Sequence, residues 1–453
     1  MPKFTSAYVQ INLKDHVDLL SFFQKIKMEN ACLLQNGMFG RYSIIGFDPI
    51  NILQYKNSKL SRKMFLDKLE KESKLFHLDL DLPFTGGALG YFSYDFGVAL
   101  HGIKQVVKND LKNFPEALFI FPSQIAVFDH EKHTISLIAW AKNSAKAKSK
   151  LQLLKKFLSN PRAKKISPNK NPSKLLFKLH DNLSKNQYLD KLDQVKKILQ
   201  KGNSYQINFS HRFWVKPQKD NFEIYKILTK INPSPYQFYF ERKNFAIISN
   251  SPERLFQIKA SNRLIQSRPI KGTTPRFLKY KEDQHSLKKL LLSLKEKAEL
   301  DMITDLVRND LGRICETGSV QVTDERVIES YSHVHHTMAN VQGFLKKTAS
   351  LTDILYAIFP GGSVTGCPKY RTMQIIDQLE EFKRYVYCGS AGYIDGRGNM
   401  DFNIMIRTIL ALKNNQWSLF FHSGGGITIG SDPVKEWEET IHKAQAIIKA
   451  IKG

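Results

Sequence analysis

The stretch "QWSLFFHSGGGITIGSDPVKEWEET" (residues 416–440) decides the fold class, because it joins a strand to a helix through a run of glycines. The part up to Ile427 is typical of a β-strand. A helix is expected to follow, with Ser431 or Asp432 as its N-cap and Pro433 in its first turn, where a missing N–H does no harm. The preceding segments "YVYCGSAGYID" (385–395) and "FNIMIRTILALK" (402–413) predict two more strands. The C-terminal part is therefore predicted as successive antiparallel strands closed by a helix.

Helices interrupt runs of strands in the same way further upstream. Residues 184–203 predict a helix with Ser184 as N-cap and Gly202 as its end. Strands are expected in "SYQINFSHRFWV" (204–215) and "YQFYFERKNFAIISNS" (236–251), and residues 286–314 form a long helical stretch with one break. The order lacks βαβ regularity, so the predicted fold class is α+β.

The N-terminal part has a mixed pattern that runs from Ala7 to about residue 145. Its β-type runs include "TGGALGYFSYDFG" (85–97) and "ALFIFPSQIAVFD" (117–129). An amphipathic helix at 144–160 precedes "PRAKKISPNKNPSK" (161–174), whose prolines and lysines predict an exposed linker. Two regions are therefore expected, residues 1–165 and residues 180–453.

Composition places the chain among globular cytoplasmic proteins. Of its 453 residues, 42% are hydrophobic and 24% are charged. No signal peptide and no membrane-spanning apolar run is expected. The four cysteines lack CxxC spacing, which indicates reduced thiols in the cytosol.

The formal net charge of +26 raises the question of nucleic-acid binding. The lysines are spread along the chain without a nucleic-acid module, which favours a lysine-rich surface instead. Such a surface raises the local concentration of a dianionic substrate or an acidic partner.

Carboxylates on two predicted helices are candidates for a Mg²⁺ site. Glu436 and Glu439 are three residues apart, hence on one helix face, and Glu299 is followed by Asp301 and Asp305. Facing carboxylates attract a hard cation such as Mg²⁺, although this spacing also occurs on solvated helix faces. The glycine run before the last helix offers backbone N–H groups to an anion, and an anion beside two carboxylates needs a metal between them.

Lys271 lies in "QSRPIKGTTPR" (266–276), which has the alternation of a half-buried strand. A lysine drawn from water near Arg268 and a metal has a lowered pKa and becomes a nucleophile. The nearby "SHVHH" (332–336) holds His333, His335 and His336, but no matching zinc ligands follow. A single inward histidine at the substrate is expected there.

Segments from about residue 180 to the C-terminus resemble the chorismate-utilising enzymes, the family of anthranilate synthase component I, aminodeoxychorismate synthase component I, isochorismate synthase and salicylate synthase. The matching segments are "GNSYQINFSHRF", "NPSPYQFYF", "ISNSPERLF", "SRPIKGTTPR", "KAELDMITDLVRNDLGRI", "SHVHHT", "FPGGSVTGCPKYRTMQIID", "GSAGYID", "FNIMIRT" and "HSGGGITIGSDPVKEWEET". The N-terminal "LLQNGMFGRYSIIGFDP" and "GGALGYFSYDFG" resemble that region of the two amine-transferring members. The resemblance implies a sandwich of two large antiparallel sheets flanked by helices, with the active site in the cleft.

The resemblance also implies roles for single residues. Glu299 and Glu439 would hold Mg²⁺, with Glu436 beside them through water, and the metal would meet the ring carboxylate of chorismate. Glu253 would be the general acid that protonates the departing 4-hydroxyl, since hydroxide is a poor leaving group. The implied substrate contacts are the backbone donors of Gly424, Gly425 and Gly426 with Lys443 nearby, Tyr393 and Arg407 at the enolpyruvyl carboxylate, His336 and Thr365 lining the pocket, and Thr273 near the ring.

Two positions sort the members of the family. The water-adding enzymes carry a lysine base where this chain has Gln206, which argues against isochorismate or salicylate formation. Anthranilate synthase has alanine at the position of Lys271, whereas the aminodeoxychorismate enzyme has lysine. A lysine that takes C2 first forces ammonia to enter at C4, and the implied product is 4-amino-4-deoxychorismate, a precursor of p-aminobenzoate and folate.

The chain departs from the family pattern at three places: "AELDM" replaces "AENLM", "GCPK" replaces "GAPK", and "LLQN" replaces the usual tryptophan-site segment. Whether the N-terminal region binds tryptophan therefore stays open. The residues expected at such a site are Leu34, Gln35, Tyr42, Ser43, Pro235 and Tyr236.

No cysteine lies in a glutaminase nucleophile sequence, so a separate glutamine amidotransferase subunit is the implied ammonia source. Two alternatives stay open. One is anthranilate synthase component I, should Lys271 not act as a nucleophile. The other is a nucleic-acid-binding protein on an inactivated enzyme fold.

Overall fold

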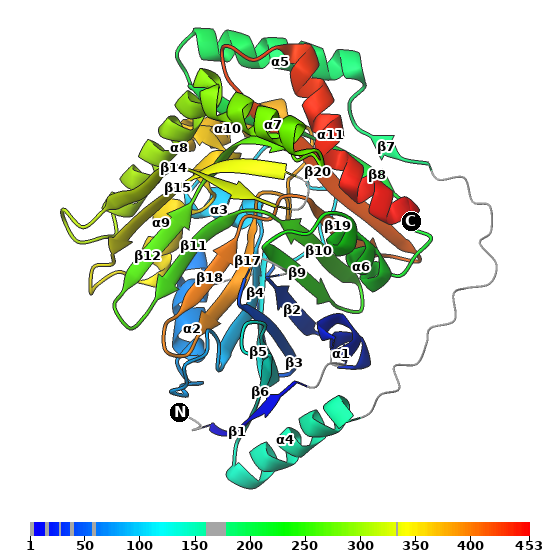
Figure 1. Cartoon of the computed structure of the whole chain (residues 1–453), viewed down its shortest axis with the longest axis vertical. Helices are drawn as coiled ribbons and strands as arrows, with labels where there is room; N and C mark the ends of the chain where they lie inside the picture. Colours follow the sequence, from blue (N-terminus) through cyan, green and yellow to red (C-terminus); the bar gives the residue numbers. More distant parts are fainter. Residues whose placement is uncertain are drawn as a thin grey trace.

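A computed structural model describes residues 4–13, 18–26, 29–36, 40–56, 60–159, 178–331 and 334–453. The expected linker at 161–174 lies outside these ranges, as does His333. Every strand pairing that joins two sheet elements is antiparallel, and helices cover the outside of the strands (Figure 1). The structure confirms the expected sandwich of antiparallel sheets with flanking helices.

The first sheet runs from the N-terminal strand to the strand that carries Gln206. Its order is β1 (Thr5–Asn12), β6 (Thr134–Ala141), β5 (Ala117–Asp129), β3 (Tyr42–Tyr55), β2 (Ala31–Gln35), β9 (Tyr236–Glu241), β10 (Phe245–Ser251), β19 (Thr408–Lys413), β20 (Trp417–Ile427) and β8 (Gln206–Val215), with the short β7 (His180–Asp181) and β16 (Gly366–Cys367) on β8.

The second sheet begins on the same long strand, because the first residues of β5 also pair with β4. Its order is β4 (Gly87–Phe92), β17 (Ser390–Asp395), β18 (Met400–Asn403), β11 (Arg254–Lys259), β12 (Leu264–Arg268) and β15 (Val334–Phe344), and β15 also pairs with β13 (Ile270–Pro275) and β14 (Gln321–Ser330). Strands from before and after the expected boundary at 165–180 pair directly, as β2 does with β9 and β4 with β17. The two expected regions therefore share one core.

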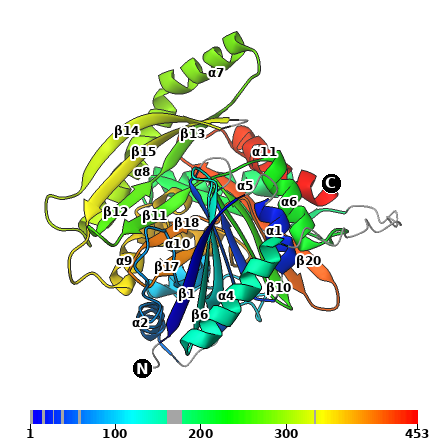
Figure 2. The same cartoon turned by 60° about the horizontal axis from the view of Figure 1, so that its bottom comes forward.

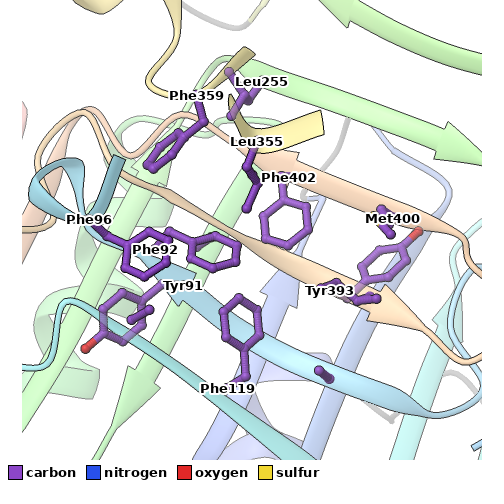
Figure 3. Close-up of a cluster of buried hydrophobic side chains, with 14 of the residues drawn as sticks. Tyr91, Phe92, Phe96, Phe119, Leu255, Leu355, Phe359, Tyr393, Met400 and Phe402 are labelled. Atoms are coloured by element: carbon purple, nitrogen blue, oxygen red, sulfur yellow. The ribbon is translucent and has the colours of Figure 1, made fainter. Parts of the chain in front are cut away.

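Aromatic side chains fill the space between the sheets. The ring of Phe92 on β4 lies 4.7 Å from that of Phe119 on β5 and 5.9 Å from that of Phe402 on β18 (Figure 3). All three are fully buried. Each such ring contributes on the order of 2–3 kcal/mol through burial, so this cluster ties the two sheets together.

The helices complete the fold on its outer faces. They are α1 (Leu19–Ile26), α2 (Arg62–Ser73), α3 (Tyr94–Leu100), α4 (Ser144–Ser159), α5 (Lys185–Gln200), α6 (Asn221–Ile231), α7 (Tyr280–Leu292), α8 (Leu294–Gly312), α9 (Leu351–Ile358), α10 (Lys369–Leu379) and α11 (Pro433–Lys452). Helix α4 lies across β1 and β6 (Figure 2). Among the described residues no helix is both long and apolar enough to cross a membrane.

Two helices on different sheets position the site. Ala444 and Ile447 of α11 pack into the core of the first sheet, and Ile303 and Val307 of α8 pack into the core that contains the second sheet. Nζ of Lys295 near the start of α8 lies 3.9 Å from Oε1 of Glu436 near the start of α11, so the acidic beginnings of the two helices lie close together. The space between them is called the cleft below.

Local signals confirm several predicted boundaries. Ser184 caps α5 in a capping box with Gln187, and the Asp432 side chain accepts a hydrogen bond from the N–H of Lys435 at the start of α11. The predicted break in the long helical stretch falls at Ser293, which ends α7 and caps α8.

Three predicted strands are wrong in extent. The run 85–97 is strand only to Phe92, because Ser93 caps helix α3. Strand β17 begins at Ser390, after Cys388, whose backbone has positive φ. The predicted strand 402–413 is interrupted between β18 and β19, where Arg407 has a φ of 51°. This interruption turns the chain at Arg407.

Candidate active site

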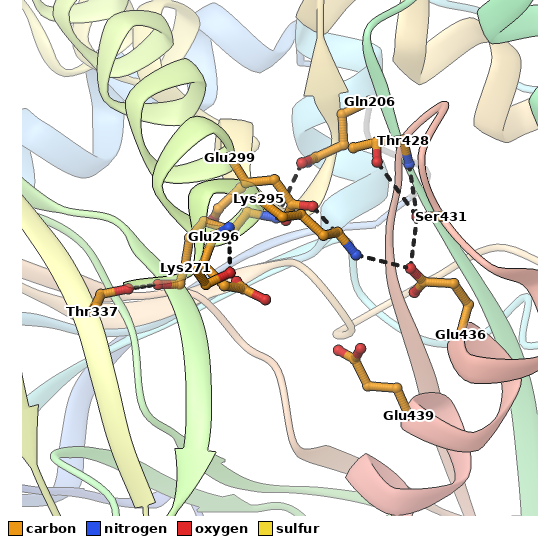
Figure 4. A network of polar contacts seen from close by, with 12 residues as sticks. Gln206, Lys271, Lys295, Glu296, Glu299, Thr337, Thr428, Ser431, Glu436 and Glu439 are labelled. Atoms are coloured by element: carbon orange, nitrogen blue, oxygen red, sulfur yellow. Dashed lines mark hydrogen bonds and ion pairs between the residues drawn. The ribbon is translucent and has the colours of Figure 1, made fainter. Parts of the chain in front are cut away.

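The amine of Lys271, on strand β13, lies between Gln206 of β8 and Glu299 of α8. Its Nζ donates a hydrogen bond of 3.1 Å to Oε1 of Gln206 and lies 3.9 Å from a carboxylate oxygen of Glu299 (Figure 4). Burial lowers the pKa of Lys271, and the charge of Glu299 opposes that shift. The amine is therefore drawn toward its neutral, nucleophilic form.

The lack of a side chain at Gly426 leaves room for the Lys271 amine beside the backbone of β20. A Cβ built on Gly426 would lie 2.9 Å from Cδ of Gln206 and 3.0 Å from Nζ of Lys271. Any side chain there would therefore displace the amine or the amide. Nε2 of Gln206 is buried and has no hydrogen-bond partner among the described residues, which leaves a donor for a bound molecule.

A bulge next to Lys271 shapes the same strand. The register of β13 against β15 shifts between Lys271 and Thr273, and Gly272 between them has a φ of 84°. A Cβ on Gly272 would lie 2.7 Å from Oγ1 of Thr337 and 3.1 Å from Oε2 of Glu296. Glycine is thus required by both conformation and space.

Glu253 stands just before strand β11 and is 5% exposed. Its Oε1 accepts a hydrogen bond of 2.7 Å from the hydroxyl of Ser363. Burial raises the pKa of Glu253 to about 7, against the lowering effects of Ser363 and of the nearby Lys271. A carboxyl group with this pKa still carries its proton in a large fraction of molecules at neutral pH, as a general acid must.

Four carboxylates face one another across the cleft. Glu296 and Glu299 come from the first turns of α8, and Glu436 and Glu439 come from the first turns of α11 (Figure 4). Burial raises the pKa of Glu296 and of Glu436, and the neighbouring charges of Glu299 and Glu439 add to these shifts. Partial burial would also raise the pKa of Glu439, whose side chain is 55% exposed, but Lys443, Lys295 and Lys271 together lower it.

The four carboxylates have the oxygen ligands that a divalent cation prefers, but their present positions do not form a complete ligand shell. In the described part of the chain no group of three or more acidic, histidine or cysteine side chains is close enough to hold an ion. Yet Oε1 of Glu299 is buried without a hydrogen bond, and the carboxylates repel one another, as Glu299 does Glu296 and Glu439 does Glu436. A hard cation with oxygen ligands and retained water would meet both needs.

Backbone donors lie beside these carboxylates on β20. The pairing of β20 with β19 ends at Phe421, whereas its pairing with β8 continues to Ile427. The described strands therefore leave one side of Gly424, Gly425 and Gly426 open to the cleft. Lys443 stands nearby, with its Nζ 3.1 Å from the carbonyl of Gly424 and 2.7 Å from Glu439.

His336 and Thr273 form one polar pair on the cleft wall. Nδ1 of His336 lies 2.7 Å from the hydroxyl of Thr273. Burial and the nearby Arg407 lower the pKa of His336 to about 3, so the imidazole is neutral. His335 faces the other way, with Ser330 and Asp283, so only one histidine of this pair faces the cleft. Thr365 is fully buried, and its hydroxyl donates to the carbonyl of Gly361.

The guanidinium group of Arg407 is a candidate binding group for an anion. Burial lowers its pKa, and no hydrogen bond or ion pair of its side chain is found within the described residues. A partly buried cation without a counter-charge favours binding of a carboxylate.

Tyr393 lies elsewhere than the resemblance implies. Its ring packs 5.5 Å from that of Phe84 and lines a second cavity, together with Tyr236 and Arg254. The structure therefore does not group it with Arg407. Strand β17 sends alternate side chains to opposite faces, and the face of Tyr393 was not visible from its motif.

The second cavity has a volume of about 220 Å³ and lies between the N-terminal strands and β17–β18. Leu34, Tyr42 and Tyr236, three of the six residues predicted for a tryptophan site, line it. Two other expected residues are engaged elsewhere: Gln35 accepts from the hydroxyl of Tyr225, and Ser43 bonds His130. Pro235 is not among the lining residues. The polar lining that the sequence did not suggest comprises Asn36, Arg41, Gln237, Arg254, Gln257, Asp401 and Asn403.

Three cleft residues were missed from the sequence. Glu296 precedes Glu299 by three residues, the same spacing as Glu436 and Glu439, and this signal was available. The sequence around Lys295 and Ser363 did not indicate a role at the site. Their contacts, with Glu436 and Glu253, come from distant parts of the chain.

Comparison with known proteins gives relatives over nearly the whole chain. A family model described as chorismate binding enzyme matches residues 30–449. The aminodeoxychorismate synthase component 1 of Bacillus subtilis is 35% identical over 96% of this chain and 94% of its own. The anthranilate synthase component 1 of Acetivibrio thermocellus is 33% identical over 98% of this chain and 95% of its own. The crystal structure of anthranilate synthase component I from Streptococcus pneumoniae superimposes with a TM-score of 0.79, at 29% identity, over 96% of this chain and 98% of that one.

Proposed function

Because the chain belongs to the family of chorismate binding enzymes, we propose that it aminates chorismate at C4 and forms 4-amino-4-deoxychorismate, as an aminodeoxychorismate synthase component I. Relatives with this name and with the name anthranilate synthase are about equally similar, so overall identity does not decide between the two reactions. The observation that carries the proposal is the amine of Lys271, whose side chain is only 14% exposed, which contacts Gln206 and has a lowered pKa.

In the proposed reaction the neutral amine of Lys271 attacks C2 of chorismate. The ring double bonds shift, and the 4-hydroxyl leaves as water after Glu253 has given it a proton. Ammonia then adds at C4, the double bonds shift back, and the lysine leaves C2 as an amine. The sum is chorismate plus ammonia giving 4-amino-4-deoxychorismate plus water, so Lys271 is regenerated.

The remaining residues would hold the substrate. Glu299 and Glu439 would bind Mg²⁺, with Glu436 and Glu296 beside them, and the ion would supply the positive charge that lets the ring carboxylate approach. The open edge of Gly424–Gly426 would donate backbone hydrogen bonds to this carboxylate, and Arg407 would pair with the enolpyruvyl carboxylate. Gln206, which has no basic group, would orient the Lys271 amine without activating water.

A separate glutamine amidotransferase subunit is the proposed source of ammonia. The component 1 names of the relatives support a partner component. Purified protein with chorismate, Mg²⁺ and ammonium is expected to form 4-amino-4-deoxychorismate, identified by chromatography and mass. Anthranilate as the main product would contradict the proposal and favour the second named activity.

Glu253→Gln is expected to bind chorismate but not to convert it, because an amide cannot protonate the leaving hydroxyl. We expect the turnover rate to fall by about a hundredfold or more, with chorismate affinity unchanged in calorimetry. Ser363→Ala is the control, because it removes the hydrogen bond to Glu253 but keeps the acid. Normal turnover of Glu253→Gln would place the acid elsewhere.

The raised pKa of Glu253 also predicts a pH effect on stability. A carboxyl with a folded pKa of about 7 binds its proton more tightly than the unfolded chain does, so wild-type stability falls as pH rises from about 4.5 to about 7. Glutamine cannot ionise. The thermal midpoint of Glu253→Gln relative to wild type is therefore expected to be higher at pH 8 than at pH 5.

We further propose that the second cavity binds tryptophan. Aromatic and aliphatic side chains, including Tyr42, Tyr236 and Leu34, would surround the indole, and the polar residues would meet the amino-acid group. Tryptophan is expected to raise the thermal midpoint of wild type, and Tyr236→Ala should lose this response. Phenylalanine serves as the ligand control, and an unchanged midpoint with tryptophan in wild type would contradict the proposal.

A further inference from the structure

We propose that the ammonium group of Lys295 occupies the carboxylate cluster in the absence of Mg²⁺. It moves out to solvent when the ion binds. The carboxylate cluster is here the set of Glu296, Glu299, Glu436 and Glu439. The inference rests on the proposed function in one respect, which is that Mg²⁺ is the ion taken up by this cluster.

The position of the ammonium carries the proposal. Nζ of Lys295 lies 3.8 Å from Oε1 of Glu299 on α8 and 3.9 Å from Oε1 of Glu436 on α11 (Figure 4). It is therefore a cation between a carboxylate of α8 and a carboxylate of α11. Oε1 of Glu299, one of the two oxygens it approaches, is the buried atom without a hydrogen bond.

The same distances indicate that Lys295 is held loosely. Both exceed hydrogen-bond range, so the ammonium is kept there by charge and not by directed bonds. Its side chain is 54% exposed, and no hydrogen bond of its Nζ is found within the described residues. A lysine has four flexible methylene groups, so the ammonium can leave for water without movement of the helix.

The other two lysines beside the carboxylate cluster are held differently. Lys271 donates to Gln206 at 3.1 Å with a side chain that is only 14% exposed. Lys443 donates to Glu439 at 2.7 Å and to the carbonyl of Gly424 at 3.1 Å. Hydrogen bonds hold the ammonium groups of Lys271 and Lys443 in place. Within the described residues, the ammonium group of Lys295 makes no hydrogen bond.

Charge balance gives the reason for an exchange. Four carboxylates face Lys271, Lys295 and Lys443. Four negative and three positive groups leave a formal charge of −1 when all are ionised, and the charge is −2 when the Lys271 amine is neutral, as the proposed attack requires. Addition of Mg²⁺ with Lys295 still in place would put a dication and an ammonium within a few ångströms of each other. Departure of Lys295 removes this repulsion and frees Glu299 and Glu436 to turn toward the ion. Lysine and Mg²⁺ therefore compete for one set of oxygens.

The test is direct titration of Mg²⁺ into wild type, Lys295→Met and Lys297→Met at constant ionic strength, without chorismate. Methionine keeps most of the apolar stem and removes the charge. We expect the Mg²⁺ dissociation constant of Lys295→Met to fall by about tenfold, because the competitor is gone. Lys297 is the matched control on the same helix turn, because its ammonium lies 3.9 Å from Asp301, outside the cluster, and its variant should bind Mg²⁺ as wild type does.

Thermal unfolding gives a second readout of the same competition. Without Mg²⁺, Lys295→Met is expected to melt below wild type, because the carboxylates lose a counter-charge. With saturating Mg²⁺ its midpoint should rise by more than that of wild type. A weaker or unchanged Mg²⁺ affinity of Lys295→Met would overturn the inference, since it would make Lys295 a helper or a bystander of the ion.

Failure of this inference can be told apart from failure of the proposed function. A wild-type chain that forms 4-amino-4-deoxychorismate, with a Lys295→Met variant of unchanged Mg²⁺ affinity, would overturn the role of Lys295 alone. A wild-type chain that forms no such product, with a Lys295→Met variant that binds Mg²⁺ more tightly, would overturn the proposed function and support the competition.

Discussion

Lys271→Ala is expected to lose formation of 4-amino-4-deoxychorismate by about a thousandfold or more, in the range seen when a catalytic nucleophile is removed. C2 and C4 are both electrophilic ends of the activated ring, and ammonia is small enough to reach either. Only an occupied C2 forces entry at C4. The alanine variant should therefore release a small amount of product aminated at C2, aminodeoxyisochorismate or anthranilate, detected by chromatography and mass.

Lys271→Arg separates the nucleophile from the charge. A guanidinium stays protonated at any pH at which the protein is folded, so this variant is expected to be nearly inactive and to form no C2-aminated product. Its bulk would also press on Gly426, where the lysine amine already lies 3.0 Å from a Cβ position.

An adduct on Lys271 is the direct evidence for covalent catalysis. Wild type incubated with chorismate and Mg²⁺ but without ammonia should carry a mass increase on the peptide that contains Lys271, and Lys271→Ala should carry none. The covalent route would be abandoned on two joint results: no adduct under any trapping condition, and an alanine variant that makes 4-amino-4-deoxychorismate at the wild-type rate.

Glu439→Gln is expected to weaken Mg²⁺ binding by at least about tenfold and to abolish turnover while the fold stays intact. The amide removes one negative charge from the carboxylate cluster and leaves Lys443 without its 2.7 Å ion pair. An anionic substrate would then meet the remaining carboxylates without enough cation between them. Calorimetry gives the Mg²⁺ affinity, and the thermal midpoint gives the integrity of the fold.

Glu438→Gln is the matched control for this variant. Glu438 is the preceding residue of α11 and, within the described residues, makes no side-chain hydrogen bond or ion pair, so the same chemical change there leaves the cluster untouched. Near-normal turnover of Glu439→Gln at low Mg²⁺ would remove Glu439 from the metal site.

The interactions that the sequence predicted correctly are mostly short in range. A cap such as Ser184 or Asp432 bonds an N–H three residues away, and the break at Ser293 depends on the same kind of bond. Glu436 and Glu439 share a helix face because their spacing is close to one turn. Such features need no knowledge of the rest of the chain.

Contacts that the sequence did not reveal have a common physical cause. Tyr393 pairs across strands with Leu89, a residue more than three hundred positions away in the chain, and this pairing decides which cavity its ring enters. Gln35 and Ser43 satisfy their polar groups with Tyr225 and His130, which the tryptophan-site pattern did not include. A strand pattern predicts that a side chain alternates, but not which cavity lies on either face.

The sequence by itself determined the antiparallel α+β character of this protein, several helix ends, the family resemblance and the choice of Lys271, Glu253, Glu299, Glu436 and Glu439 as candidate site residues. Only the tertiary structure decided that α8 and α11 meet, that Gly426 leaves room for the Lys271 amine, and that Lys295 stands between the carboxylates. The reason is that propensity and capping act over a few residues, whereas a site assembled from β8, β13, β20, α8 and α11 depends on packing between segments far apart in the chain.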